Sequence, residues 1–95
     1  MKRTVVRYQV KPDQAEANKE AIRAVFAELN RERPEGIRYA SYALEDGVTF
    51  VHVAAEEEGA SLTEREAFKE FQKGLPQRID TPPEALGADE VGSYG

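Results

Sequence analysis

The sequence predicts a single α+β domain with the element order β-α-β-β-α-β. Three observations support this prediction. Apolar residues alternate with a period of two in three short segments, they recur at helical spacing in two others, and an Asp-Gly pair separates two of the strands. A chain of 95 residues is the size of one domain, so residues 1–95 are expected to fold as one unit.

The first predicted strand covers Thr4–Val10, in which β-branched and aromatic residues alternate between two faces. Lys11 and Pro12 end this strand, and Asp13 followed by Glu16 predicts a capping box at the start of a helix. Pro34-Glu35-Gly36 ends that helix. Its apolar stripe consists of Ala15, Asn18, Ile22, Val25, Phe26 and Leu29.

Two further strands, Ile37–Leu44 and Val48–Ala55, are joined by a turn that contains Asp46-Gly47. This pair favours a two-residue type I′ hairpin, because both central residues of such a turn take positive φ. The resulting register places Ser41 opposite His52. One face of the hairpin then carries Tyr39, Ser41, Ala43, Phe50, His52 and Ala54, and the other carries Arg38, Ala40, Tyr42, Leu44, Val51 and Val53. Both faces are largely apolar, so each needs a cover.

A second, shorter helix is predicted after the acidic loop 56–60. Ser61 and Thr63 each precede a glutamate by three residues, which is typical of a capping box. The buried stripe of this helix consists of Phe68, Phe71 and Leu75. The segment Gln77–Gly87 is expected to be a connector and Asp89–Tyr94 the last strand.

This order of elements predicts a ferredoxin-like βαββαβ fold, in which two helices cover one face of a four-stranded antiparallel sheet. The other face would expose Tyr42, Leu44, Val51 and Val53, an apolar patch that monomers seldom leave uncovered. We therefore expect a homodimer that is joined through this face of the sheet.

Composition excludes several classes of function. Thirteen basic and eighteen acidic residues give a net charge of -5, which disfavours nucleic acids and anionic membranes as partners. The absence of cysteine removes disulfides and thiolate chemistry, and it favours a cytoplasmic location. The sequence contains neither a glycine-rich phosphate loop nor a metal-ligand motif, so no cofactor is expected.

Four short motifs carry a resemblance to a known family. They are Tyr8-Gln9-Val10-Lys11-Pro12, Gly36-Ile37-Arg38-Tyr39, Phe50-Val51-His52-Val53 and Ala67-Phe68-Lys69-Glu70-Phe71. Over nearly its whole length, the chain resembles the dimeric α+β barrel superfamily and, within it, the antibiotic-biosynthesis monooxygenase-like domains. The resemblance implies two sheets packed face to face as a barrel, with a small-molecule pocket between sheet and helices in each subunit. Some members are cofactor-free oxygenases of quinols or polyketide aromatics, and others degrade heme.

The chain departs from the pattern of the heme-degrading members. It has no tryptophan and no histidine on the second helix, and Val6 stands near the position where those members carry asparagine. Ala54 stands where many members have a glutamate late in the third strand. The resemblance therefore implies a protein that does not act on heme.

His52 is the candidate catalytic residue, because its ordinary pKa lies near neutrality and it could accept a proton from a phenolic or enolic substrate. The candidate substrate-binding residues are Tyr8, Tyr39, Ser41, Phe68 and Phe71. Together they suggest a cofactor-independent monooxygenase that acts on a small hydrophobic aromatic or quinol-like compound. Two alternatives stay open: a non-catalytic small-molecule-binding protein, and a purely structural dimer in which His52 is a hydrogen-bonded core residue.

Overall fold

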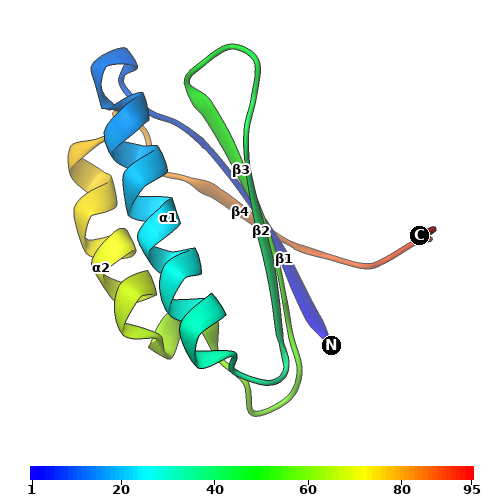
Figure 1. The fold of residues 1–95 in the computed structure, drawn as a ribbon. Helices are drawn as coiled ribbons and strands as arrows, with labels where there is room; N and C mark the ends of the chain where they lie inside the picture. Colours follow the sequence, from blue (N-terminus) through cyan, green and yellow to red (C-terminus); the bar gives the residue numbers. More distant parts are fainter.

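In a computed structural model of residues 1–95, a four-stranded antiparallel sheet carries both α-helices on one face (Figure 1). The elements are β1 (Lys2–Gln9), α1 (Ala15–Glu32), β2 (Ile37–Ala43), β3 (Thr49–Glu56), α2 (Glu66–Gly74) and β4 (Glu84–Ala88). The strands lie in the order β2-β3-β1-β4, so β1 occupies the interior of the sheet. The predicted ferredoxin-like βαββαβ fold is confirmed.

The register of the β2–β3 hairpin agrees with the prediction. Ser41 lies opposite His52, and Tyr42 lies opposite Val51. On the neighbouring strand Val6 pairs with His52, so the side chains of alternate β1 residues point to the same face as the histidine.

The turn of this hairpin is not of type I′. Gly47 has φ of 80°, whereas Asp46 does not have a positive φ. The carbonyl of Leu44 accepts the Gly47 amide at 3.1 Å, which closes a turn with a left-handed glycine at its end. The Asp46 carboxylate accepts the backbone amides of Val48 and Thr49 at 3.0 and 2.8 Å, and these bonds hold the aspartate in its ordinary backbone region.

The predicted capping box of α1 does not form. Asp13 lies in a short 3₁₀ turn, Pro12–Gln14, that precedes the helix, and no side chain caps the helix at Gln14. Pro12 fixes the backbone where the turn begins, so the helix starts one residue later than the capping pattern predicts.

The start of α2 is capped from the other helix. The Ser61 and Thr63 hydroxyls bond each other at 2.9 Å, and neither caps α2, which begins at Glu66. Instead, the Glu28 carboxylate on α1 accepts the Ala67 amide at 2.8 Å. The predicted local capping boxes are wrong because a long-range acceptor takes their place.

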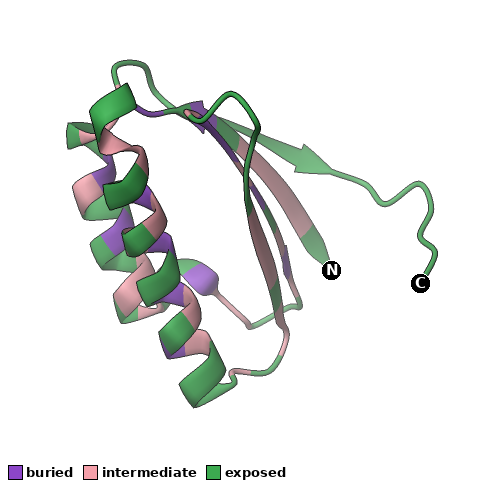
Figure 2. Cartoon of the chain, turned by 45° about the horizontal axis from the view of Figure 1, so that its top comes forward, coloured by how far each residue is buried: buried purple, intermediate pink, exposed green.

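The last strand lies earlier in the chain than predicted. The structure has β4 at Glu84–Ala88, within the expected connector, and Asp89–Tyr94 forms no strand. This strand pairs with β1, with Leu86 opposite Val5, and every residue in it is exposed. An edge strand without a buried face lacks the alternation that sequence reading relies on. The residues after it extend away from the sheet (Figures 1 and 2).

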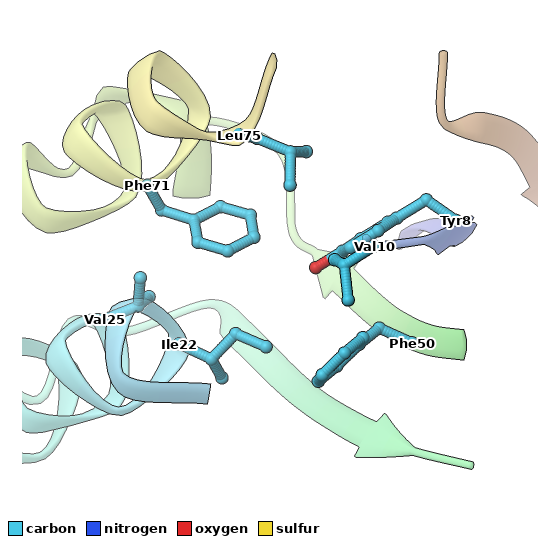
Figure 3. Close-up of a cluster of buried hydrophobic side chains, with 7 residues drawn as sticks. All are labelled: Tyr8, Val10, Ile22, Val25, Phe50, Phe71 and Leu75. Carbon is cyan, nitrogen blue, oxygen red and sulfur yellow. The ribbon is translucent and has the colours of Figure 1, made fainter. Parts of the chain in front are cut away.

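The core lies between the helices and the inner face of the sheet (Figures 2 and 3). Its buried apolar side chains are Tyr8, Val10, Ile22, Val25, Phe50, Phe71 and Leu75. On the outer face Tyr42, Leu44 and Val53 are exposed, as the predicted register requires. Neither helix has the length and apolar character needed to cross a membrane.

Candidate functional site

A cavity of about 360 Å³ lies between the inner face of the sheet and α2. Leu62, Phe68, Phe71 and Leu75 contribute apolar side chains to its wall. On the sheet side, Tyr8, Tyr39 and His52 contribute polar atoms. Five of the six candidate residues from the sequence therefore lie around one cavity, which is apolar on the helix side and hydroxyl-rich on the sheet side.

His52 is at the centre of the polar side of this cavity. Its side chain is 4% exposed, and both ring nitrogens have hydrogen-bonding partners. Nε2 lies 2.7 Å from the Tyr8 hydroxyl, and Nδ1 lies 2.6 Å from the Tyr39 hydroxyl and 2.7 Å from Ser41 Oγ. The imidazole is therefore held in one orientation by three hydroxyl groups on two other strands.

Ser41 lies outside the cavity, contrary to the prediction that it lines the wall. Its hydroxyl contacts Nδ1 of His52, as the Tyr39 hydroxyl does, and it borders a shallow surface hollow next to Lys19 and Arg23 on α1. The register predicted the contact with His52 correctly. Whether Ser41 also reaches the cavity depends on the twist of the sheet and the packing of α1, which the register does not specify.

Two residues of the site were missed by sequence reading. The Asn18 side-chain amide donates to the Tyr8 hydroxyl at 2.9 Å, and Arg78 Nε donates to Asn18 Oδ1 at 2.9 Å. Asn18 is completely buried. One signal was present in the sequence, since an asparagine within an apolar helical stripe needs a buried polar partner. Nothing comparable marks Arg78.

Burial controls the protonation of the site. It lowers the pKa of His52 to about 4, so the imidazole is neutral at pH 7. Burial raises the pKa of Tyr8 to about 12, against the opposing effect of the hydrogen bond from Asn18. Burial also raises the pKa of Tyr39, and a hydrogen bond with Ser41 opposes that rise. The side chains of Tyr8, Tyr39 and His52 are therefore uncharged at neutral pH.

Aromatic packing restrains the same side chains. The His52 ring stacks between Tyr8 and Tyr39, with centroid distances of 5.3 and 5.7 Å. Tyr39 also stacks on Phe26 of α1 at 5.0 Å and meets the edge of Phe68 of α2 at 5.9 Å. These contacts limit rotation of the hydroxyl-bearing rings, so the polar groups are placed before any ligand arrives.

Lys2 and Glu56 also line the cavity, but most of its wall is apolar and the groups around His52 are neutral. Such a cavity suits a small neutral or weakly acidic organic molecule with an oxygen substituent. No group of three or more imidazole or carboxylate side chains is arranged to hold a metal ion. The chemistry available from the chain itself is hydrogen bonding and proton transfer by tyrosine and histidine.

Comparisons with known proteins agree with this architecture. No protein-family model matches the sequence, and no curated protein matches it significantly. A solved structure from Nitrosomonas europaea, provisionally named an antibiotic biosynthesis monooxygenase, matches 97% of this chain and 100% of its own, with a TM-score of 0.81 and 24% identity. The chain shares this fold.

Two further structures extend the match. The Rv0793 protein of Mycobacterium tuberculosis has a TM-score of 0.79 and 14% identity, and covers 99% of this chain and 98% of its own. A structure described as an antibiotic biosynthesis monooxygenase has a TM-score of 0.75 and 16% identity, and the match covers 97% of this chain and 100% of that one. The fold of antibiotic biosynthesis monooxygenase structures thus extends over nearly the whole chain, at low sequence identity.

Proposed function

We propose that the protein is a cofactor-independent oxygenase of a small phenolic or quinol-like aromatic compound, which binds in the cavity beside His52. The observation that carries the proposal is that the cavity has an aromatic wall on one side and a hydroxyl-bearing wall on the other. Phe68 and Phe71 provide an aromatic surface for a ring, and the Tyr8–His52–Tyr39 array faces it with hydroxyl groups. The fold shared with antibiotic biosynthesis monooxygenase structures supports the same class of reaction.

In this proposal His52 is the base, and it acts through Tyr8. The tyrosine hydroxyl is 2.7 Å from Nε2, so it passes its proton to the imidazole as it accepts one from a hydroxyl group of the substrate. The resulting electron-rich anion transfers electrons directly to dioxygen. When a phenol is oxidised to a quinone, one oxygen atom enters the ring and the other leaves as water. The substrate supplies all the electrons, and the chemistry requires no cofactor.

One observation favours a second candidate, a non-catalytic binding protein. With a pKa of about 4, His52 is a weak base in the empty cavity, and each of its ring nitrogens is already hydrogen-bonded. A protein that only binds its ligand needs the same apolar wall and hydroxyl groups, but it does not need proton transfer.

The proposal also includes a homodimer that is joined through the outer face of the sheet. Tyr42, Leu44 and Val53 are exposed there, with Tyr42 at 56% exposure. Because both helices cover the inner face, a second copy of the sheet is a cover of matching shape and character for the outer face.

Oxygen uptake with 1-naphthol tests the reaction. We expect the protein to consume dioxygen and form 1,4-naphthoquinone, and His52→Ala to lower turnover by about 10²–10⁴-fold, as for loss of a general base. Tyr94→Phe alters a fully exposed tyrosine and serves as the control. Binding of 1-naphthol without oxygen uptake would select the second candidate, and the absence of both would reject the two proposals together.

A further inference from the structure

We propose that a one-way chain of hydrogen bonds ends at the Tyr39 hydroxyl, whose own proton binds an acceptor oxygen of the ligand in the cavity. Arg78 and Asn18 set the direction of this chain, and Tyr8 and His52 transmit it. The inference rests on the proposed function for the presence of a ligand in the cavity, and it adds the chemical class of the ligand atom that the protein recognises.

The direction is set at Arg78. A guanidinium group carries only hydrogen-bond donors, so the Asn18 atom 2.9 Å from Arg78 Nε is the amide oxygen. The NH₂ group of Asn18 therefore points the other way, where the Tyr8 oxygen lies at 2.9 Å. Asn18 donates to Tyr8 and cannot accept from it.

The donor role of Asn18 then fixes the hydrogen-bond direction between Tyr8 and His52. The Tyr8 hydroxyl has two hydrogen-bond partners, and since Asn18 is a donor, its proton goes to His52 Nε2 at 2.7 Å. Nε2 is therefore an acceptor. A neutral imidazole carries one proton, which must then sit on Nδ1. Burial of His52, which lowers its pKa to about 4, keeps the ring neutral at pH 7.

The chain ends at Tyr39. The Nδ1 proton of His52 faces the oxygens of Tyr39 and Ser41 at 2.6 and 2.7 Å, so these oxygens act as acceptors. The Tyr39 oxygen therefore accepts a hydrogen bond from His52, and its own proton takes no part in that bond. Because Tyr39 lines the cavity, that proton is available to a ligand.

This arrangement selects for a ligand with an acceptor oxygen, such as a quinone carbonyl or a phenolate, next to Tyr39. A phenolate formed by proton transfer through Tyr8 would gain a stronger hydrogen bond from Tyr39 than the neutral phenol. The same residue would therefore favour the ionised substrate. Arg78 and Asn18 act as positioning residues, because they influence the ligand only through the side chains between them and it.

The tautomer of His52 tests the direction without any ligand. It is the only histidine, so ¹⁵N NMR of histidine-labelled protein reports its ring directly. We expect the proton on Nδ1 in the native protein. Asn18→Asp is isosteric but only accepts hydrogen bonds at neutral pH, so it should take the Tyr8 proton, reverse the chain and move the imidazole proton to Nε2. The same change at the exposed Asn30 of α1 is the control.

Two results would overturn the proposed direction: a native protein with the proton on Nε2, or a tautomer that does not respond to Asn18→Asp. Should that variant fail to fold, Arg78→Met provides a second test at the half-buried end of the chain. Without the guanidinium the Asn18 side-chain amide can flip, so both tautomers of His52 should be populated. A tautomer unchanged in Arg78→Met contradicts the role of Arg78.

Ligand affinity tests the end of the chain. We expect 1,4-naphthoquinone to bind more tightly than naphthalene, and Tyr39→Phe to weaken quinone binding by about threefold to tenfold with no change for naphthalene. Asn18→Asp should weaken quinone binding by a similar factor, although residue 18 does not touch the ligand. The control Tyr94→Phe should leave quinone binding unchanged. Equal affinity of the native protein for the two compounds overturns the role of Tyr39. Neither experiment requires turnover, so a lack of oxygen uptake would reject the oxygenase alone.

Discussion

The imidazole of His52 is an uncharged hydrogen-bonding hub in a wall of aromatic rings. Its neighbours at hydrogen-bonding distance are three hydroxyl groups, and no carboxylate is among them. Hydroxyl groups stabilise an imidazolium much less than an anion does, so the desolvation of the ring decides its protonation state. The site is therefore built for neutral histidine.

This protonation state predicts a pH dependence of stability. The pKa of His52 falls from 6.5 to about 4 on folding, so between these values the unfolded chain binds more protons than the folded one. The contribution is fully present above pH 6.5 and is lost as the pH falls toward 4. We expect the free energy of unfolding of the native protein to drop by about 2–3 kcal/mol more than that of His52→Gln between pH 7.5 and 4.5, in urea titrations. Equal decreases in the free energy of unfolding of the native protein and of His52→Gln would contradict a buried neutral His52.

The sequence predicts part of this site. Alternation along β1 and the hairpin register place Tyr8, Tyr39, Ser41 and His52 on one face, and period-two geometry is sufficient for that step. The link from Asn18 to Arg78 spans 60 positions and depends on how the segment after α2 folds back over α1. Periodicity within an element carries no information on such a contact.

At the scale of elements, Glu28 joins the two helices. One carboxylate oxygen accepts the Ala67 amide at 2.8 Å and the other accepts Arg65 Nε at 3.1 Å. The glutamate is only 8% exposed, so this link between the helices is buried. A carboxylate at the start of α2 also interacts favourably with the dipole of that helix. This buried cap replaces the local caps that the sequence offers.

Removal of this cap should destabilise the fold. We expect Glu28→Ala to lower the free energy of unfolding by about 1–3 kcal/mol, because it leaves the first turn of α2 uncapped and removes one of the two carboxylates that bind Arg65. Urea denaturation measures the change. Glu20→Ala, which breaks an exposed pair with Arg23 on the same helix, should cost less than about 1 kcal/mol. Similar losses in the two variants would show that Glu28 acts as a surface residue.

Strand prediction succeeds where one face of the strand is buried and fails where neither face is. For β1, β2 and β3 the predicted bounds lie within two residues of the observed ones. In β4 all five residues are exposed, and pairing with β1 rather than burial selects Glu84–Ala88. The type of the Asp46 turn is likewise decided by backbone hydrogen bonds that the Asp46 carboxylate accepts, while the register follows from the strand pattern.

At the scale of the whole molecule, the sheet has one covered face and one open face. In Figure 1 both helices lie on the same side of the sheet. The open face carries Tyr42, Leu44 and Val53 from the hairpin and Leu86 from β4, each of them exposed. Removal of this apolar surface from water would stabilise a dimer through the hydrophobic effect.

Charges on this face should therefore disrupt the proposed dimer. We expect sedimentation to give a species of about twice 10.6 kDa for the native protein, and a monomer for Leu44→Asp and Val53→Asp, since each would place an unpaired charge in the interface. Ala27→Glu on the exposed side of α1 is the control and should remain dimeric. A native protein that sediments as a monomer at micromolar concentration would refute the dimer.

The sheet order β2-β3-β1-β4 also constrains the route by which the chain folds. Of the four strands β1 comes first in sequence, yet its partners are distant: Thr4 pairs with Ala54 on one side and with Gly87 on the other. During synthesis both edges of β1 stay unpaired until most of the chain has emerged, and only the β2–β3 hairpin can form from neighbouring residues. Until then, the exposed backbone of β1 is the segment most open to aggregation and to protection by chaperones.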